Sequence, residues 1–302
     1  MSEAEKLLQS FDDCGIDYNL LMAEAFLGYK YRKSKGTLYS SDVSIPVNLI
    51  KWYYTVHFNL VEFDKLKKAF VTRYVNNESK IEQVDEDYII EGLREMYEYI
   101  HSEDIEYMFD IYTIKDLHRK LFSKTPFPEY AGDFRKNFAH LKGTTTEICD
   151  WTMIRPNLEI LDEEVQRLRK ASKLIRSACD TNALIKYLGD CVVLGCKIIK
   201  VHPFVDGNKR TTRGFINKLL EDAGLPPVYI KANERDEYLL ALSKAHNEEN
   251  YTDIKNFYLY KVCDSIIELD INERVRKNKE DKRKSEEESV VVKKIGTYPD
   301  NK

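Results

Sequence analysis

Glycine and proline are scarce in this chain of 302 residues, which contains 12 and 8 of them. Few residues therefore interrupt its apolar side chains, which recur at intervals of three and four over long stretches, and this pattern predicts an all-α fold. The chain also lacks a continuous apolar run of about 20 residues, the length that a membrane helix needs. Its first residues, MSEAEKLLQSFDD, are acidic where a signal peptide is basic. We therefore expect a cytoplasmic protein that does not enter a membrane, although a secreted effector delivered without a cleaved signal would look the same.

An excess of basic charge is missing too. Lysine and arginine number 47 against 51 acidic residues, which gives a formal net charge of -4. No overall positive field exists to hold nucleic acid or an anionic membrane, so neither is expected as a partner. The six cysteines include no CxxC pair, which disfavours a zinc site and a redox motif.

Four segments carry a clear helical periodicity. In the first three segments the apolar residues form a single stripe, and in the third of them charged residues cover the other face. In the fourth segment apolar residues surround the helix almost completely, as expected of a central helix. The four segments are Tyr88 to Ile100, Ile114 to Phe122, Leu158 to Ala178 with its stripe at Leu161, Val165, Leu168 and Leu174, and Leu184 to Ile199.

Between these helices, Phe134 to Pro156 breaks the pattern, because Gly143 and three threonines separate two short apolar runs. Such a segment predicts a β-hairpin or an extended flap. From about Asn272 onward the charges lose their periodicity, which predicts a frayed helix end and a disordered tail. The basic half of this tail could be interpreted as a nuclear signal, but a solvated tail is the favoured interpretation.

The predicted domain organisation has three parts. Residues 1–105 form an added N-terminal helical region, residues 106–268 form the main domain, and residues 269–302 form the charged tail. Four aromatic residues of the first part are expected in the core, although they could instead recognise a partner. They are Trp52, Tyr53, Tyr54 and Phe58.

A polar loop, from His202 to Arg213, follows the most apolar helix and precedes an amphipathic run from Gly214 to Ala223. The start of a helix presents unpaired backbone N–H groups and the positive end of the helix dipole, which together suit a phosphate. Gly207 allows the backbone to approach a ligand closely, and Asn208 tolerates unusual dihedral angles. The loop can therefore form an anion-binding nest.

The charged residues of this loop suit phosphoryl or nucleotidyl transfer. His202 could accept a proton from an attacking hydroxyl near neutral pH. Asp206 is a hard oxygen ligand for Mg²⁺. Arg210 and Arg213 lie three residues apart, so both could grip phosphates from one helix face.

Each of these residues also has a plainer interpretation. A single histidine beside proline and phenylalanine is more often a packed loop residue, and Asp-Gly-Asn is more often a turn or a helix cap. Arginines in a first helical turn can simply be solvated. Cations are nevertheless unfavourable beside a helix N-terminus unless an anion compensates them, which favours a ligand. A Walker A loop is excluded because no second glycine stands at the required distance before the lysine.

The loop resembles the signature of the Fic family in seven demanding positions, and weaker similarity extends from about Tyr112 to Tyr260. This resemblance implies a protein adenylyltransferase that transfers AMP from ATP to a protein hydroxyl, with Mg²⁺. It implies that His202 is the general base, that Asp206 binds the metal, and that Phe204 anchors the loop in the core. The residues that it assigns to the phosphates of ATP are Gly207, Asn208, Lys209, Arg210 and Arg213.

Lys209 departs from the pattern, because the AMP-transferring members usually have glycine there. A lysine resembles the Doc branch, which phosphorylates its targets. Doc proteins, however, generally lack the arginine that is present here as Arg213, so AMP transfer is favoured. A third hypothesis, an inactive interaction module, is disfavoured because degenerate members usually lose a residue such as His202 or Asn208, and both are present.

The segment from Asn77 to Val84 resembles an inhibitory motif of the family, with Glu82 as its glutamate. The match is imperfect, because Ser79 stands one position too close and Gln83 replaces glycine or asparagine. An ordinary charged helix end is the competing interpretation. If the resemblance holds, Glu82 pairs with Arg213 and displaces the γ-phosphate.

Contacts to the nucleotide base and to the target are further expectations. Tyr238 could pack against adenine and Asn247 could reach the base or ribose, although a tyrosine at helical spacing is equally a core residue. The resemblance implies that the flap, from Phe138 to Ile154, binds the target protein by strand addition. Neither the identity of the target nor the oligomeric state follows from the sequence, so a homo-oligomer is left open.

Overall fold

The computed structural model describes residues 2–12, 43–57, 63–84, 86–139, 146–271, 280–281 and 283–284. Every regular element in these ranges is helical, and no strand occurs among them. The prediction of an all-α fold is confirmed. No helix of the described ranges is both long enough and apolar enough to cross a membrane.

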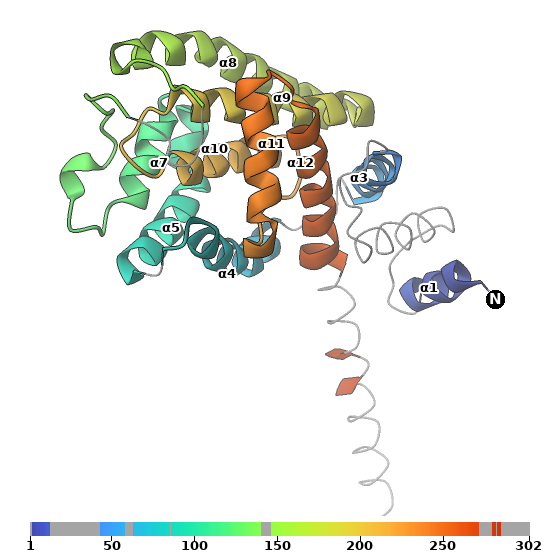
Figure 1. Cartoon of the computed structure of the whole chain (residues 1–302). Helices are drawn as coiled ribbons and strands as arrows, with labels where there is room; N and C mark the ends of the chain where they lie inside the picture. Colours follow the sequence, from blue (N-terminus) through green and yellow to red (C-terminus); the bar gives the residue numbers. More distant parts are fainter. Residues whose placement is uncertain are drawn as a thin grey trace, which may run out of the picture.

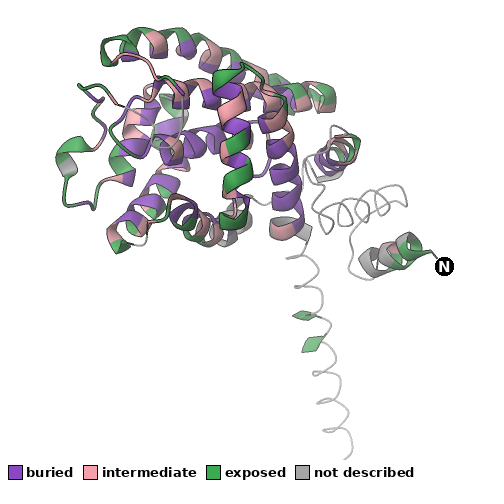
Figure 2. Ribbon diagram, viewed as in Figure 1, coloured by how far each residue is buried: buried purple, intermediate pink, exposed green. Residues whose placement is uncertain are grey.

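The centre of the fold is α9 (Thr181–Val201), which packs against α8 (Ile154–Ala178), α10 (Asn208–Asp222) and α12 (Thr252–Ser265) (Figure 1). Buried residues occupy most of its surface (Figure 2), as its apolar sequence predicts. α8 joins α9 through a tight connection, in which Cys179 ends α8 in the left-handed conformation and Asp180 caps α9. The Asp180 carboxylate accepts two N–H groups of the first turn of α9, which satisfies donors that a helix start leaves unpaired.

A second group of helices covers one side of α10. It consists of α5 (Asp87–Ile100) and α7 (Thr113–Leu121), which pack closely on each other. Gly92 permits this approach, because a Cβ atom there would lie 2.0 Å from the carbonyl oxygen of Leu121. The stripes predicted for both segments face this core, and the two helices therefore form one side of the platform that carries the polar loop.

The N-terminal helices share the same core. α3 (Ser44–His57) packs against α9 and α12, and the Tyr54 hydroxyl donates a hydrogen bond to the carbonyl of Ala223 at 2.8 Å. Trp52 and Tyr53 are also buried, so the prediction that these aromatics belong to the core is confirmed, whereas Phe58 lies outside the described residues. α4 (Phe63–Glu82) packs on α5 and ends beside the polar loop.

The remaining elements are short or peripheral, apart from α11, which flanks the polar loop. The tail predicted from Asn272 onward lies outside the described residues except for four helical positions. The predicted domain boundary near residue 105 stays a prediction, since α5 and α7 on either side of it pack together. The elements are α1 (Glu3–Asp12), α6 (Glu103–Tyr107), α11 (Arg235–Asn247), the 3₁₀ turns Pro128–Tyr130, Trp151–Met153 and Ala232–Glu234, and a π-helical turn, Ile266–Ile271.

Two local predictions need correction. No strand pairing is found in the described parts of the flap, residues 134–139 and 146–153, while residues 140–145 lie outside the description. The end of the predicted second arm is instead the turn Trp151–Met153, capped by the Asp150 side chain, and Ile154 already begins α8. In α8, Leu174 is 69% exposed and Ile175 is buried in its place, because Ile175 continues the stripe two turns after Leu168, whereas Leu174, six residues after Leu168, lies off it.

Candidate active site

The polar loop connects α9 to α10 and turns back at both ends. His202 ends α9 in the left-handed conformation, with φ 52°, and Gly207 begins α10 with φ 74°. A Cβ atom on Gly207 would lie 2.5 Å from the Phe122 ring, so this position requires glycine for space as well as for its dihedral angles. The loop is thereby forced to present its polar side chains on one side of the helix start.

Asn208 locks the inside of the loop. Its side-chain oxygen accepts the N–H of Phe204 at 2.8 Å, and its amide nitrogen donates to the carbonyl of the same residue. Because the Asn208 oxygen accepts from an N–H donor, its NH₂ group is the one that faces His202, and the nitrogen lies 3.1 Å from Nε2 of the histidine. Nε2 therefore accepts, and the ring proton is on Nδ1. Burial, together with the charge of Arg135, lowers the pKa of His202 to about 4, so its imidazole is neutral at pH 7.

A second histidine, His118, supports the loop from α7. Its ring stacks between Phe122 and Phe204, 3.9 Å from the centroid of the latter. The N–H of Gly132 donates to its Nδ1 at 2.9 Å, so its Nε2 carries the proton and donates to the carbonyl of Asp206 at 3.0 Å. Burial lowers the pKa of His118 to about 4. Phe204 is 1% exposed, which agrees with the anchoring role that the family resemblance implies.

Asp206 and Arg210 pair with each other at the rim of the loop. The Arg210 Nη2 atom donates to an oxygen of Asp206 at 2.8 Å. The arginine side chain is 3% exposed, while the carboxylate is 70% exposed. Nη1 of Arg210 is buried without a hydrogen-bond partner in the described part of the chain. A buried donor without a partner is costly, which fits a site that receives an anion.

Arg213 lies deeper and is held by two glutamates from α4. Its Nε contacts both carboxylate oxygens of Glu78, at 2.8 and 3.0 Å, and its Nη2 donates to Glu82 at 2.7 Å. The ring of Tyr238 lies 5.6 Å from the centre of the guanidinium. The predicted contact of Glu82 with Arg213 is thus present, whereas Glu78 was not predicted.

Glu82 also reaches Lys209, whose ammonium nitrogen lies 2.9 Å from its second oxygen. Burial opposes the charge of Glu82, but the two cations outweigh it and lower the pKa of this carboxyl to about 2. Burial instead raises the pKa of Glu78 above its usual value, although Arg213 opposes this shift. Glu82 is therefore firmly ionised and bridges α4 to the start of α10.

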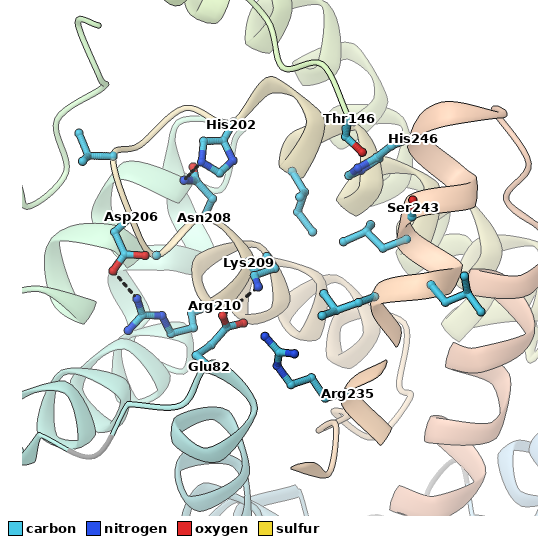
Figure 3. Close-up of a pocket in the computed structure, with 16 residues that line it drawn as sticks. Glu82, Thr146, His202, Asp206, Asn208, Lys209, Arg210, Arg235, Ser243 and His246 are labelled. Carbon is cyan, nitrogen blue, oxygen red and sulfur yellow. Dashed lines mark hydrogen bonds and ion pairs between the residues drawn. The ribbon is translucent and has the colours of Figure 1, made fainter. Parts of the chain in front are cut away.

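A pocket of about 1020 Å³ opens above the loop and is large enough for a nucleotide-sized ligand (Figure 3). It extends from the loop to one face of α11, and its walls combine charged side chains near the loop with apolar ones farther away. Its lining residues are Glu82, Thr146, Ile199, His202, Val205, Asp206, Gly207, Asn208, Lys209, Arg210, Arg235, Leu239, Leu240, Leu242, Ser243 and His246.

Tyr238 and Asn247 do not line this pocket. Tyr238 is 1% exposed and lies in the core against Arg213. Asn247 instead accepts a hydrogen bond at 3.0 Å from the hydroxyl of Thr146, at the end of the flap. Asn247 lies one turn after Ser243, whose hydroxyl accepts a hydrogen bond from the Asn247 amide at 3.2 Å, so it adjoins the pocket at the end of α11. Leu239, Ser243 and His246 line this part of the pocket, and the nucleotide contacts of Tyr238 and Asn247 stay predictions.

Arg135 is a further residue to which the sequence pattern assigned no role. It is 4% exposed, and its Nε donates to the carbonyl of His202 at 2.7 Å. Its other nitrogens donate to the carbonyls of Asn137 and Cys149, one on each arm of the flap. Arg135 therefore joins both ends of the flap to the loop. In the sequence, its position three residues after Gly132, at the start of the predicted flap, is the one signal that could have identified it.

A divalent cation would find one protein ligand here. Within the described ranges, no group of three or more histidine, cysteine, aspartate and glutamate side chains could hold a metal ion alone. The exposed carboxylate of Asp206 is a suitable hard oxygen donor. Mg²⁺ often binds through one carboxylate together with phosphate oxygens and water, so the site fits this cation only together with a phosphate-bearing ligand.

Comparison with known proteins supports the family resemblance. Residues 108–220 match the model of the Fic/DOC family. Proteins named "Protein adenylyltransferase Fic" from Drosophila melanogaster and Drosophila sechellia are 32% identical to the chain over 181 residues, which is 58% of this chain and 32% of theirs. The chain thus spans about a third of the length of these relatives.

Solved structures show the same fold. A Fic domain containing signaling protein from Bacteroides thetaiotaomicron superimposes with a TM-score of 0.56 at 15% identity, covering 78% of this chain and 98% of that one. Fic-1 from C. elegans gives a TM-score of 0.54 at 17% identity, covering 77% of this chain and 69% of that one. At such identities the likeness concerns the fold alone.

Proposed function

Because residues 108–220 are a Fic/DOC domain, we propose that the chain is a protein adenylyltransferase, which transfers AMP from ATP to a hydroxyl side chain of another protein. The observation that carries the proposal is the neutral imidazole of His202, held at the mouth of a phosphate-suited helix start by Asn208. The names of relatives that are 32% identical add support.

In the proposed reaction, Nε2 of His202 accepts the proton of the target hydroxyl. The hydroxyl oxygen then attacks the α-phosphorus of ATP, the bond between this phosphorus and the oxygen bridging to the β-phosphate breaks, and pyrophosphate leaves. The neutral state of His202 and the available lone pair on Nε2 meet the requirement for a general base. The amide of Asn208 holds this ring in place until the hydroxyl replaces it as the hydrogen-bond donor.

The phosphates would lie against the first turn of α10, where Gly207 and Asn208 contribute backbone N–H groups and Arg210 contributes its unpaired Nη1. Asp206 would hold Mg²⁺, which neutralises charge on the phosphates during transfer. The base would lie toward Leu239, Ser243 and their neighbours on α11. Tyr238 and Asn247 would then support the pocket from outside.

The target protein would lie along the flap, from Phe138 to Ile154. Phe138 is 76% exposed, Met153 is 47% exposed and Trp151 is 39% exposed, so the described parts of the flap offer apolar contacts near the loop. Val205 at the loop itself is 63% exposed. Backbone hydrogen bonds to the flap would hold the target segment with little dependence on its side chains.

Lys209 supports a second candidate, a Doc-like protein kinase. Its side chain lines the pocket where the AMP-transferring relatives usually have glycine, and a reversed ATP would then present its γ-phosphorus to the hydroxyl with ADP as the leaving group. Arg213 favours the first candidate, since the resemblance places a γ-phosphate there.

We further propose that Glu82 keeps the site inhibited, because it occupies both Arg213 and Lys209. Intact-protein mass spectrometry after incubation with ATP and Mg²⁺ tests these proposals together. Wild type, Glu82→Gly and His202→Asn are compared, with a cell lysate as the source of targets. A gain of about 329 Da per site, the size of an AMP moiety added by nucleotidyl transfer, is expected in the target and is expected to be larger with Glu82→Gly.

Other outcomes of the mass measurement would support the alternative functions. A gain of about 80 Da, one phosphoryl group, would identify the kinase. No His202-dependent gain in any variant would favour an interaction module without activity. Equal activity of wild type and Glu82→Gly would reject the inhibitory role of Glu82 and leave the transfer reaction untouched.

The protonation of His202 gives a prediction that needs no substrate. Since burial lowers its pKa to about 4, the neutral form persists as the pH falls and is lost only as the pH passes through about 4. The ¹³Cε1 resonance of His202, assigned with His202→Asn, should therefore not shift between pH 8 and about pH 5. Protonation of His202 should therefore cause no decline in transfer activity near pH 6.5. A titration midpoint close to 6.5 would contradict the buried, neutral base.

A further inference from the structure

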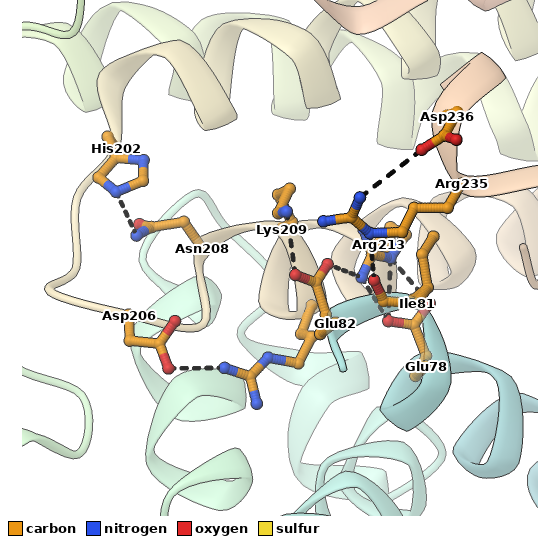
Figure 4. A network of polar contacts seen from close by, with 11 residues as sticks. Glu78, Ile81, Glu82, His202, Asp206, Asn208, Lys209, Arg213, Arg235 and Asp236 are labelled. Atoms are coloured by element: carbon orange, nitrogen blue, oxygen red, sulfur yellow. Dashed lines mark hydrogen bonds and ion pairs between the residues drawn. The ribbon is translucent and has the colours of Figure 1, made fainter. Parts of the chain in front are cut away.

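The two ends of the pocket differ in character. Ion pairs gather at the loop end, where Glu82 lies 2.9 Å from the ammonium nitrogen of Lys209 and 2.7 Å from Nη2 of Arg213 (Figure 4). At the other end, the lining residues of α11 from Leu239 to Ser243 carry no charge. Phosphates suit the first end. A flat, largely apolar ring with a few polar atoms at its edge suits the second.

His246 is held firmly at this second end. Its Nε2 lies 2.9 Å from the carbonyl oxygen of Cys196 on α9, and its own carbonyl accepts a hydrogen bond from the Lys200 ammonium group at 2.9 Å. A carbonyl oxygen can only accept, so Nε2 carries the ring proton and donates it. Burial lowers the pKa of His246, which favours the neutral ring at pH 7. Nδ1 is therefore left with a lone pair and no proton.

The lone pair of this Nδ1 is accessible from the pocket. The His246 side chain lines the pocket, at the end away from Asp206 (Figure 3). No residue in the described ranges makes a hydrogen bond to Nδ1, and, unlike Nδ1 of His202, this atom is not fully buried. It is therefore an acceptor that a ligand with a donor group can use.

Ser243 adds a donor one turn earlier on the same helix face. The hydroxyl of Thr146 donates to the side-chain oxygen of Asn247 at 3.0 Å, and the Asn247 amide donates in turn to the Ser243 oxygen at 3.2 Å. The Ser243 proton comes last in this chain, and it has no acceptor among the residues that the structure describes. The pocket thus offers one acceptor, Nδ1 of His246, beside one donor, the Ser243 hydroxyl.

We infer that Ser243 and His246 select the base of the nucleotide, as a donor and an acceptor that match the edge of adenine. Adenine has a ring-nitrogen acceptor next to its 6-amino donor, whereas guanine has a 6-oxo acceptor in place of that donor. His246 accepts from the 6-amino group, and Ser243 donates to the neighbouring ring nitrogen. A 6-oxo purine instead places its oxygen against the Nδ1 lone pair, which leaves two acceptors without a donor. This inference rests on the proposed binding of a nucleoside triphosphate in this pocket.

Nucleotides that differ only in the 6-substituent of the purine test the inference. They are ATP, purine riboside triphosphate, which lacks the 6-amino group, and inosine triphosphate, which has a 6-oxo group. Their dissociation constants are measured with Mg²⁺ by titration calorimetry on the whole chain. We expect the wild type to bind ATP about fivefold more tightly than purine riboside triphosphate, and about tenfold or more tightly than inosine triphosphate, as the loss of one hydrogen bond and an added repulsion predict.

Two substitutions of His246 separate its acceptor from its packing. His246→Phe removes the acceptor, so ATP and purine riboside triphosphate should bind with affinities within about twofold of each other. His246→Gln can donate its amide to the Cys196 carbonyl and still present an oxygen acceptor, so it should keep the preference for ATP.

Ser243→Ala should weaken the binding of ATP and of purine riboside triphosphate by about fivefold each, because both purines have the ring nitrogens, and should leave their ratio unchanged. Ser177→Ala, on the exposed face of α8, controls for the loss of a serine hydroxyl and should change no affinity. An unchanged affinity of Ser243→Ala for ATP would overturn the role of this serine.

The role of His246 is overturned if the wild type binds the three triphosphates equally, or if His246→Phe weakens ATP and purine riboside triphosphate by the same factor. The comparison in the wild type needs no variant, so it decides even where a His246 variant does not fold. If no triphosphate binds at all, the proposed function itself is overturned. Equal binding of all three would leave that function intact and remove only the selection of the base.

Discussion

Replacement of His202 by asparagine is expected to lower the transfer rate by about 10²–10⁴-fold, the range over which a positioned general base contributes. The Nε2 atom is the acceptor that faces the loop, and its pKa of about 4 keeps it free of a proton at pH 7. Asparagine at this position offers no comparable base. Rates are measured as AMP incorporated per minute in the Glu82→Gly background, where the signal is largest.

Asparagine is chosen because His202 has φ 52°, and asparagine adopts this left-handed region more readily than alanine does. The free energy of unfolding should therefore change by less than about 1 kcal/mol, a limit set by the modest cost of a left-handed residue. ATP affinity should also be retained, since phosphate contacts come from other residues. A variant that folds, binds ATP and still transfers AMP at more than about a tenth of the wild-type rate would disprove the role of His202.

Most of the fold could be predicted because its signals are local. The apolar period of the four long segments is set by which face each helix buries, and α5, α7, α8 and α9 are found where this period occurs. The flap was predicted less well. A short apolar run is compatible with a strand and with the start of a helix. Here the Asp150 side chain caps the turn Trp151–Met153, which leads directly into α8.

The residues of the candidate site also differ in how well the sequence predicts them. Residues of the loop itself are contiguous, so the motif identifies His202, Asp206 and Asn208 together. Partners that reach the loop from other helices depend on packing. Glu78 shares a helix face with Glu82 four residues later, and that spacing could have indicated it. The pocket face of α11 could not be chosen, because Leu239 and Tyr238 are both apolar and only the contact of the latter with Arg213 separates them.

The buried pair of Glu78 and Arg213 leads to the second large effect, on stability. Both side chains are almost fully buried, at 0% and 4% exposed, and a buried charge that loses its partner costs about 3–5 kcal/mol. Arg213 has two carboxylate partners, however, so either glutamate can compensate it alone. Their contributions should therefore be strongly non-additive.

Urea unfolding of the whole chain measures this effect. Glu82→Gln should cost about 1–3 kcal/mol, because the carboxylate loses its contacts with Arg213 and Lys209 while Glu78 still compensates the arginine. Glu78→Gln should cost about 1–3 kcal/mol, since Glu82 still compensates the arginine. The double variant leaves Arg213 buried without a carboxylate, and it should lose about 3–5 kcal/mol beyond the single changes. Glu98→Gln on the exposed face of α5 serves as the control for removing a carboxylate.

Additive losses would show that the two glutamates act independently, and that Glu78 is not the counter-charge that holds Arg213 when Glu82 withdraws. The non-additive result has a consequence for regulation. If Glu78 alone keeps the arginine compensated, Glu82 can leave without stranding a buried, unpaired charge, and the inhibited and released states differ by the loss of the Glu82 contacts alone. A target or a nucleotide that favours the released state by only a few kcal/mol could then shift the population of the enzyme.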